Sequence, residues 1–169
     1  MTYSLIVYPD LLPGDILLSR NLGDDEENNA TPGYWNHSGI YVGNDRVVEA
    51  QSPPWGGKVL LSHKIEYFQR YPYLVVKRHV QPHKDPEAGN VAANEAIKSV
   101  GVKYRKLASL FRRLRSVSKG ENCVSVVRRG WAIALGEDPR WVKPDDIYND
   151  TDFEVVYQQQ DEADNEMET

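Results

Sequence analysis

Three residues of this chain have side chains that can perform nucleophilic catalysis together: Cys123, His37 and Glu49. Cysteine catalysis needs a thiolate, a base that holds the thiol proton, and a group that orients the base. Cys123 is the only cysteine and stands at the start of the apolar run 122–135, which predicts a helix ended by Gly136. The unpaired N–H groups and the dipole of a helix N-terminus favour a thiolate. The position of Cys123 therefore indicates a nucleophile.

His37 and Glu49 lie on the two arms of a predicted β-hairpin whose turn is formed by residues 43–45. A turn of this odd length places Glu49 opposite Gly39 in an antiparallel pair. His37 is then the diagonal neighbour of Glu49, about 7–8 Å away at Cβ, a gap that a glutamate side chain spans. One imidazole nitrogen would bond to Glu49 and the other would face Cys123. No local pattern predicts whether the cysteine helix packs against this hairpin.

Each of the three residues also has a purely structural interpretation. A lone cysteine in an apolar helix is more often a small buried hydrophobe than a nucleophile. Glu49 follows two apolar residues and precedes Ala50, an unusual setting for a surface carboxylate, so the joint placement favours a site. A zinc site made by Cys123, His37 and His63 is an alternative, although the spacing matches no common ligand pattern.

Strand patterns dominate the first half of the chain and helix patterns the second. Strands are predicted at 15–20, 37–42, 46–50, 58–61, 73–78 and 153–157, and helices at 62–68 (with Ser62 as the cap), 86–100, 106–116 and 122–135. The expected buried face of the helix at 86–100 consists of Val91, Ala93, Ala96, Ile97 and Val100. This order of elements predicts an α+β fold with a mostly antiparallel sheet and helices packed on one side of it.

The length of 169 residues and the ten tyrosines and four tryptophans suit one domain with a substantial core. We expect a single catalytic domain over residues 1–158 and a disordered acidic tail over 159–169. One cysteine excludes an intrachain disulfide. No segment approaches the ~18 apolar residues of a transmembrane helix. Because the first residues do not form a signal-peptide pattern, a cytoplasmic protein is expected.

The net charge of −5 is distributed unevenly along the chain. Acidic residues gather at 24–27, in a long polar loop over 21–36, and again after residue 160. Residues 103–119, the basic segment, carry only positive charges. This segment is interpreted as a solvated surface, or as a contact with an anionic substrate or an anionic membrane surface. Nucleic acid is a less favoured partner, because the chain is acidic overall and carries no known reader motif.

Four segments taken in order resemble the circularly permuted NlpC-type papain-like family, and its YiiX-like branch is most similar. The segments are Pro13-Gly14-Asp15-Ile16, His37-Ser38-Gly39-Ile40-Tyr41-Val42-Gly43, Val47-Val48-Glu49-Ala50 and Asn122-Cys123-Val124-Ser125, within a resemblance that covers about residues 12–147. In that family the cysteine helix follows the β-barrel half, which accounts for the order His, Glu, Cys. The resemblance implies a papain-like fold, with Cys123 as nucleophile, His37 as general base and Glu49 as the orienting acid.

The function implied by this resemblance is that of a cysteine hydrolase working through a thioester and without a cofactor. Its substrate would be an amide in a peptide or an amino-acid conjugate, such as a cell-wall peptide fragment. Tyr41 and Tyr104 are candidate substrate-binding residues, although aromatic side chains more often lie in the core. Two alternatives remain open: a lipid acyltransferase or phospholipase that uses the basic segment on a membrane, and a non-catalytic binding module with the same fold. The residues after Cys123, and the segments 21–36 and 103–119, depart from the family pattern and leave the substrate open.

Overall fold

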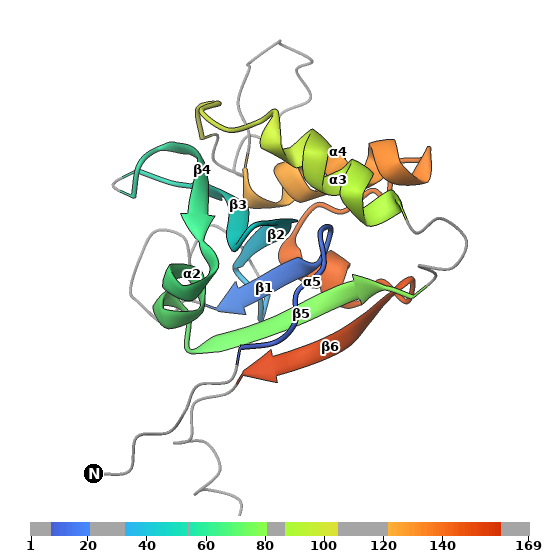
Figure 1. Cartoon of the computed structure of the whole chain (residues 1–169), viewed down its shortest axis with the longest axis horizontal. Coiled ribbons are helices and arrows are strands. Elements are labelled where there is room, and N and C mark those ends of the chain that lie inside the picture. Colours follow the sequence, from blue (N-terminus) through green and yellow to red (C-terminus); the bar gives the residue numbers. More distant parts are fainter. Residues whose placement is uncertain (1–7, 21–32, 54, 81–86, 105–121, 160–169) are drawn as a thin grey trace, which may run out of the picture.

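The structure, a computed structural model, describes residues 8–20, 33–53, 55–80, 87–104 and 122–159. The predicted helix at 106–116, most of the basic segment, residues 21–32 of the polar loop and the tail from 160 lie outside these ranges. In the described residues, strands form one open antiparallel sheet in the order β4-β3-β2-β1-β5-β6 (Figure 1). They are β1 (Ile16–Arg20), β2 (His37–Gly43), β3 (Arg46–Gln51), β4 (Lys58–His63), β5 (Tyr73–His79) and β6 (Phe153–Gln159). The predicted α+β class is confirmed, with an open sheet in place of a closed barrel.

Helices cover both faces of the sheet, so the prediction that they lie on one side is wrong. The helices are α2 (Lys64–Arg70), α3 (Ala88–Ile97), α4 (Cys123–Leu135) and α5 (Pro144–Tyr148). Side chains of α3, α4 and α5 share one core cluster with Ile16 and Leu18, whereas those of α2 share a second cluster with Leu17. Successive strand residues point to opposite faces. The buried side chains of β1 therefore pack alternately into the two clusters.

The cysteine helix α4 has the boundaries that the sequence predicts, because both of its ends are capped. The Asn122 side chain accepts from the Ser125 N–H at 2.8 Å, and the Ser125 hydroxyl accepts from the Asn122 N–H at 2.8 Å. This reciprocal pair is a capping box, which fixes the first turn of a helix. Gly136 ends the helix with φ 73°. The helix packs against β2 and β3, so the tertiary contact between the cysteine helix and the hairpin is present.

The buried face of α3 agrees with the prediction at Ala93 and Ala96 and differs from it at the larger apolar residues. Val91, Ile97 and Val100 are 38%, 41% and 42% exposed, whereas the buried residues of the helix are alanines at positions 88, 92, 93 and 96. The reason is the close approach of α3 to α4, which lie side by side in Figure 1. A Cβ at Gly130 of α4 would stand 2.6 Å from the Ala92 carbonyl oxygen. Only small side chains fit between two helices at this separation, so the larger apolar residues of α3 face outward.

Two predicted boundaries also need correction. His63, and not Ser62, caps α2: its Nδ1 accepts from the Ile65 N–H at 3.2 Å. Ser62 belongs to β4, where it pairs with Val47. Strand β6 continues to Gln159, one residue into the expected tail, because its last residue pairs with Leu74 of β5. Pairing with β5 keeps these polar residues in the sheet.

Candidate active site

The predicted register of the hairpin is confirmed and brings His37 and Glu49 together. Gly39 of β2 pairs with Glu49 of β3, which makes His37 the diagonal neighbour of the glutamate. His37 Nε2 lies 2.8 Å from Glu49 Oε2. Both side chains are buried, and Glu49 has no exposed surface. A buried carboxylate is costly unless it is paired and hydrogen-bonded, so its other partners matter.

Glu49 is held by three further donors from three different elements. The Gln51 amide donates to Oε2 at 2.7 Å, the Ser62 hydroxyl donates to Oε1 at 2.5 Å, and the Arg70 guanidinium donates to Oε1 at 2.8 Å. Burial raises the pKa of Glu49, but hydrogen bonds and charge from His37, Arg70 and Ser62 outweigh it. The result is a pKa of about 2. Glu49 is therefore a fixed carboxylate that can orient the imidazole.

The imidazole of His37 is clamped between aromatic rings on the α2 side of the sheet. Its ring stacks with Tyr71 at 5.2 Å between centroids and with Tyr67 at 5.9 Å. The Tyr67 hydroxyl lies 3.0 Å from the Ser19 hydroxyl, which anchors that ring. Burial lowers the pKa of His37, but Tyr71 and hydrogen bonds to Cys123 and Glu49 raise it well above 6.5. This environment favours the imidazolium form.

Cys123 is the first residue of α4, and its side chain is one of the groups that raise the pKa of His37. Only 4% of Cys123 is exposed, and it borders the core cluster on the α4 side of the sheet. Because Nε2 of His37 is bonded to Glu49, Nδ1 is the ring nitrogen left for the thiol. The thiol, the imidazole and the carboxylate are the groups that cysteine catalysis uses. Their catalytic roles stay a prediction.

The two predicted substrate-binding tyrosines lie in different surroundings. Tyr41 is 7% exposed in the cluster beneath α2, and its hydroxyl accepts from the Asp45 N–H at 3.2 Å, so it stabilises the hairpin turn. Tyr104 packs against the cluster that contains Cys123, and its N–H donates to the Gly57 carbonyl at 2.8 Å. The role of Tyr104 stays a prediction, and the setting of Tyr41 is that of a core residue.

Sequence reasoning missed the residues that surround Glu49 and His37, namely Gln51, Ser62, Tyr67, Arg70 and Tyr71. The sequence contains part of the pattern that identifies these residues. Ser62 is the diagonal neighbour of Glu49 on β4, since Leu60 pairs with Glu49. Positions 67, 70 and 71 follow the i, i+3, i+4 spacing of one helix face. Only the packing of α2 on the sheet shows that this face meets the hairpin.

A metal centre does not fit the described residues. In the parts of the chain that the structure covers, no three His, Cys, Asp or Glu side chains are grouped to hold an ion. His63, the third ligand of the zinc alternative, instead accepts a hydrogen bond from the backbone as the cap of α2. The zinc alternative is therefore not supported.

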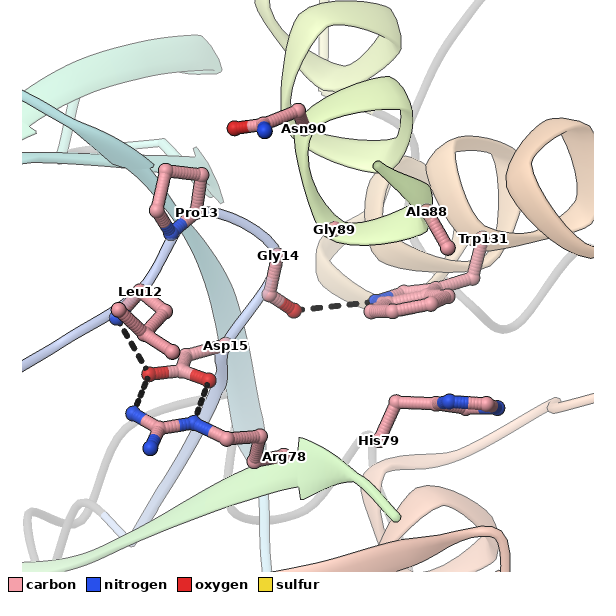
Figure 2. Close-up of a pocket in the computed structure, with 10 residues that line it drawn as sticks. All are labelled: Leu12, Pro13, Gly14, Asp15, Arg78, His79, Ala88, Gly89, Asn90 and Trp131. Carbon is pink, nitrogen blue, oxygen red and sulfur yellow. Dashed lines mark hydrogen bonds and ion pairs between the residues drawn. The ribbon is translucent and has the colours of Figure 1, made fainter. Parts of the chain in front are cut away.

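A cavity of about 180 Å³ has none of these residues in its walls and lies where the chain enters β1 (Figure 2). Its walls include Gly14, whose N–H donates to the Tyr41 carbonyl near the end of β2, at 2.8 Å. The Trp131 indole donates to the Gly14 carbonyl at 3.1 Å, and Arg78 pairs with Asp15 at 2.7 Å. These bonds join the β1 entry to α4 and β5, so we assign this region a structural role.

The pKa of Glu49 predicts a loss of stability in acid. Its pKa is lowered on folding from 4.5 to about 2, so its contribution is fully present above pH 4.5 and is lost as the pH falls toward 2. The loss amounts to up to about 3 kcal/mol of unfolding free energy. Urea unfolding at a series of pH values would measure it. The wild type should lose more stability across this window than Glu49→Gln, and equal slopes in the two proteins would contradict the prediction.

Comparisons with known proteins show the fold. No family model and no curated protein sequence matches this chain. Among solved structures it is similar to the metalloprotein YiiX from Escherichia coli O157:H7, with a TM-score of 0.64 and 18% sequence identity. The match covers 88% of this chain and 97% of the other. The chain therefore has a YiiX-like α+β fold. Among the described residues, no helix has the length and apolarity needed to span a membrane.

Proposed function

We propose that this protein is a cysteine hydrolase of the circularly permuted NlpC-type papain-like class, which cleaves an amide through a thioester. The observation that carries the proposal is the position of His37, whose Nε2 lies 2.8 Å from buried Glu49 and whose pKa is raised by Cys123 at the start of α4. A buried carboxylate with four donors orients a histidine at a substantial desolvation cost. A simple binding module has no need of such an arrangement, which favours catalysis.

The proposed reaction has two halves. The Cys123 thiolate attacks the carbonyl carbon, and a C–S bond forms. The His37 imidazolium then gives its Nδ1 proton to the amine nitrogen as the C–N bond breaks, which leaves a thioester. A water next attacks the thioester carbonyl and passes its proton to Nδ1, and the C–S bond breaks to release the acid. Glu49 holds the Nε2–H throughout and stabilises the imidazolium.

The first turn of α4 also offers a donor for the oxyanion. The N–H groups at the start of a helix have no intrahelical acceptor. Asn122 caps the N–H of Ser125, while the N–H of Cys123 belongs to the same turn as the attacking sulfur. Backbone donors placed in this way stabilise a tetrahedral intermediate by about 3–4 kcal/mol. We assign the Cys123 N–H this role.

Alkylation by iodoacetamide tests the proposed cysteine–histidine pair. A free thiol of pKa ~8.5 loses reactivity about tenfold for each pH unit below that value. If His37 takes up the thiol proton, alkylation of the wild type at about pH 6 should be faster than alkylation of His37→Ala. In His37→Ala we expect the alkylation rate to depend on pH as steeply as that of a free thiol.

The matched control is His63→Asn, because asparagine also caps helices well and His63 lies at the start of α2. This variant should show the wild-type profile. A steep profile in the wild type itself, measured by mass spectrometry of the labelled peptide, would refute the pair.

A further inference from the structure

A second cavity, of about 310 Å³, lies near the end of the sheet at which His37 begins β2. It is lined by four aromatic and two amide side chains: Tyr34, Trp35, Tyr73, Tyr148, Gln158 and Gln159. The residues come from the segment before β2, the start of β5, the end of α5 and the end of β6. A mostly aromatic cavity with a few polar groups is the usual form of a small-ligand site.

Two connections place this aromatic cavity beside the candidate active site. Trp35 precedes His37 by two residues, so their Cα atoms are at most about 7.6 Å apart, and it belongs to the same core cluster as Cys123. Gln159 donates to the Tyr71 carbonyl at 3.2 Å. Tyr71 in turn stacks on the His37 ring. The wall of the aromatic cavity is therefore linked to the imidazole through one residue, Tyr71.

The walls of the aromatic cavity are fixed by contacts within the protein. The Trp35 ring packs against Tyr34 and Tyr148, at 4.9 and 5.6 Å between centroids. The Trp35 N–H donates to Asp145 at 3.1 Å. The buried Lys77 ammonium donates to the Tyr148 carbonyl at 2.7 Å. A preformed cavity of this kind binds with little ordering cost.

Charge restricts what the aromatic cavity can accept. The Arg20 guanidinium lies 4.4 Å from the centre of the Tyr34 ring, and the Lys77 ammonium lies 5.3 Å from that of Tyr148. Two of the four aromatic rings thus already carry a cation of the protein. A cationic ligand would meet these like charges and would lose the ring faces that normally attract it. An uncharged aromatic ring can still pack edge to face against the lining rings.

We propose that the aromatic cavity binds an uncharged aromatic side chain of the substrate, adjacent to the bond that Cys123 attacks. This inference rests on the proposed function, and it adds the class of substrate. The Gln158 amide at the cavity offers a donor and an acceptor for the peptide groups next to that side chain. The Gln159 amide nitrogen already donates to the Phe68 and Tyr71 carbonyls, so this residue offers only its oxygen.

Binding to the Cys123→Ala variant tests this proposal without turnover. The probes are N-acetyl-phenylalaninamide, N-acetyl-lysinamide and N-acetyl-alaninamide, measured by calorimetry or by NMR titration. Burial of an aromatic side chain is worth at least about 1.5 kcal/mol, so the phenylalanine amide should bind about tenfold more tightly than the other two. Tyr148→Ala should remove most of this preference, and Tyr148→Phe should retain it.

The matched control is Ile133→Ala, since Ile133 is 58% exposed on α4 and lies outside the aromatic cavity. It should leave all three affinities unchanged. If Tyr148→Ala fails to fold, Tyr34→Ala serves instead, because that side chain is half exposed. Equal or tighter binding of the lysine amide, or a preference unaffected by both tyrosine variants, would overturn the proposal. If Cys123 failed to react in the alkylation assay, the proposed hydrolase function would be refuted, while the proposed binding of an aromatic side chain would still be judged by these affinities.

Discussion

Replacement of Cys123 by alanine is expected to abolish turnover while the protein stays folded. The thioester cannot form without the sulfur, and loss of a catalytic nucleophile lowers kcat by at least about 10⁴-fold. The structural cost is small, since the change removes one sulfur from the edge of the core and one hydrogen bond to His37. We expect a loss of about 1–2 kcal/mol in unfolding free energy. Hydrolysis of an aromatic aminoacyl amide and urea unfolding would measure the two effects.

A matched variant separates activity from stability. Val126 is a fully buried residue on the same helix, and its side chain has no reactive group. Val126→Ala should destabilise the protein by about 2 kcal/mol through lost packing, yet it should retain most of the wild-type activity. If Cys123→Ala kept its turnover, the thioester mechanism would be excluded.

Removal of the Glu49 side chain is expected to have the largest effect on stability. Glu49→Ala leaves Arg70, Ser62, Gln51 and His37 without the acceptor that they share. Loss of one partner of a buried ion pair typically costs about 3–5 kcal/mol, because the remaining charge stays buried without compensation. Arg70 is partly exposed and can reach water, whereas His37 cannot. Chemical denaturation of the purified variant would give the value.

Glu49→Gln distinguishes orientation from folding. The amide keeps the shape of the side chain and one acceptor, but its NH2 group faces two of the four donors and the charge is lost. We therefore expect a loss of up to about 3 kcal/mol in unfolding free energy, as for protonation of Glu49, and less than for Glu49→Ala. The substitution removes the negative charge that stabilises the imidazolium, so turnover should fall by at least about 100-fold. The control is Asp138→Asn, which breaks the exposed pair of Asp138 with Arg128. A surface pair contributes at most about 1 kcal/mol, so a loss as large as that of Glu49→Ala would contradict this account.

The sequence was sufficient wherever the determining forces are local. The alternation of two short strands correctly indicated the register that pairs Glu49 with Gly39. The turn itself is shorter than predicted: Asn44 and Asp45 form it, Gly43 pairs with Arg46, and a bulge lies between Tyr41 and Gly43. The cysteine helix was predictable because Asn122 and Gly136 cap its two ends. Both features depend on residues that are close in the chain, and a pattern of period 2 or 3.6 records them directly.

Helix packing was less predictable, because it depends on a partner surface that is distant in sequence. The apolar pattern of 86–100 correctly indicated a helix and the burial of Ala93 and Ala96, but it wrongly placed Val91, Ile97 and Val100 on the buried side. That side is decided by the absence of a side chain at Gly130, which lets α3 approach α4 at Ala92. Hydrophobicity favours burial of valine and isoleucine, but steric exclusion at this contact is stronger.

Local sequence patterns specify the α+β class, the hairpin that joins His37 to Glu49, and the cysteine at a helix start. The environment of these residues depends on tertiary packing. Arg70 and Tyr71 reach the site because α2 covers the face of the sheet opposite α4, and Tyr148 and Gln159 border the aromatic cavity through α5 and β6. These contacts join elements that are 20 to more than 100 residues apart. Their geometry depends on how both layers pack on the sheet, which no local pattern contains.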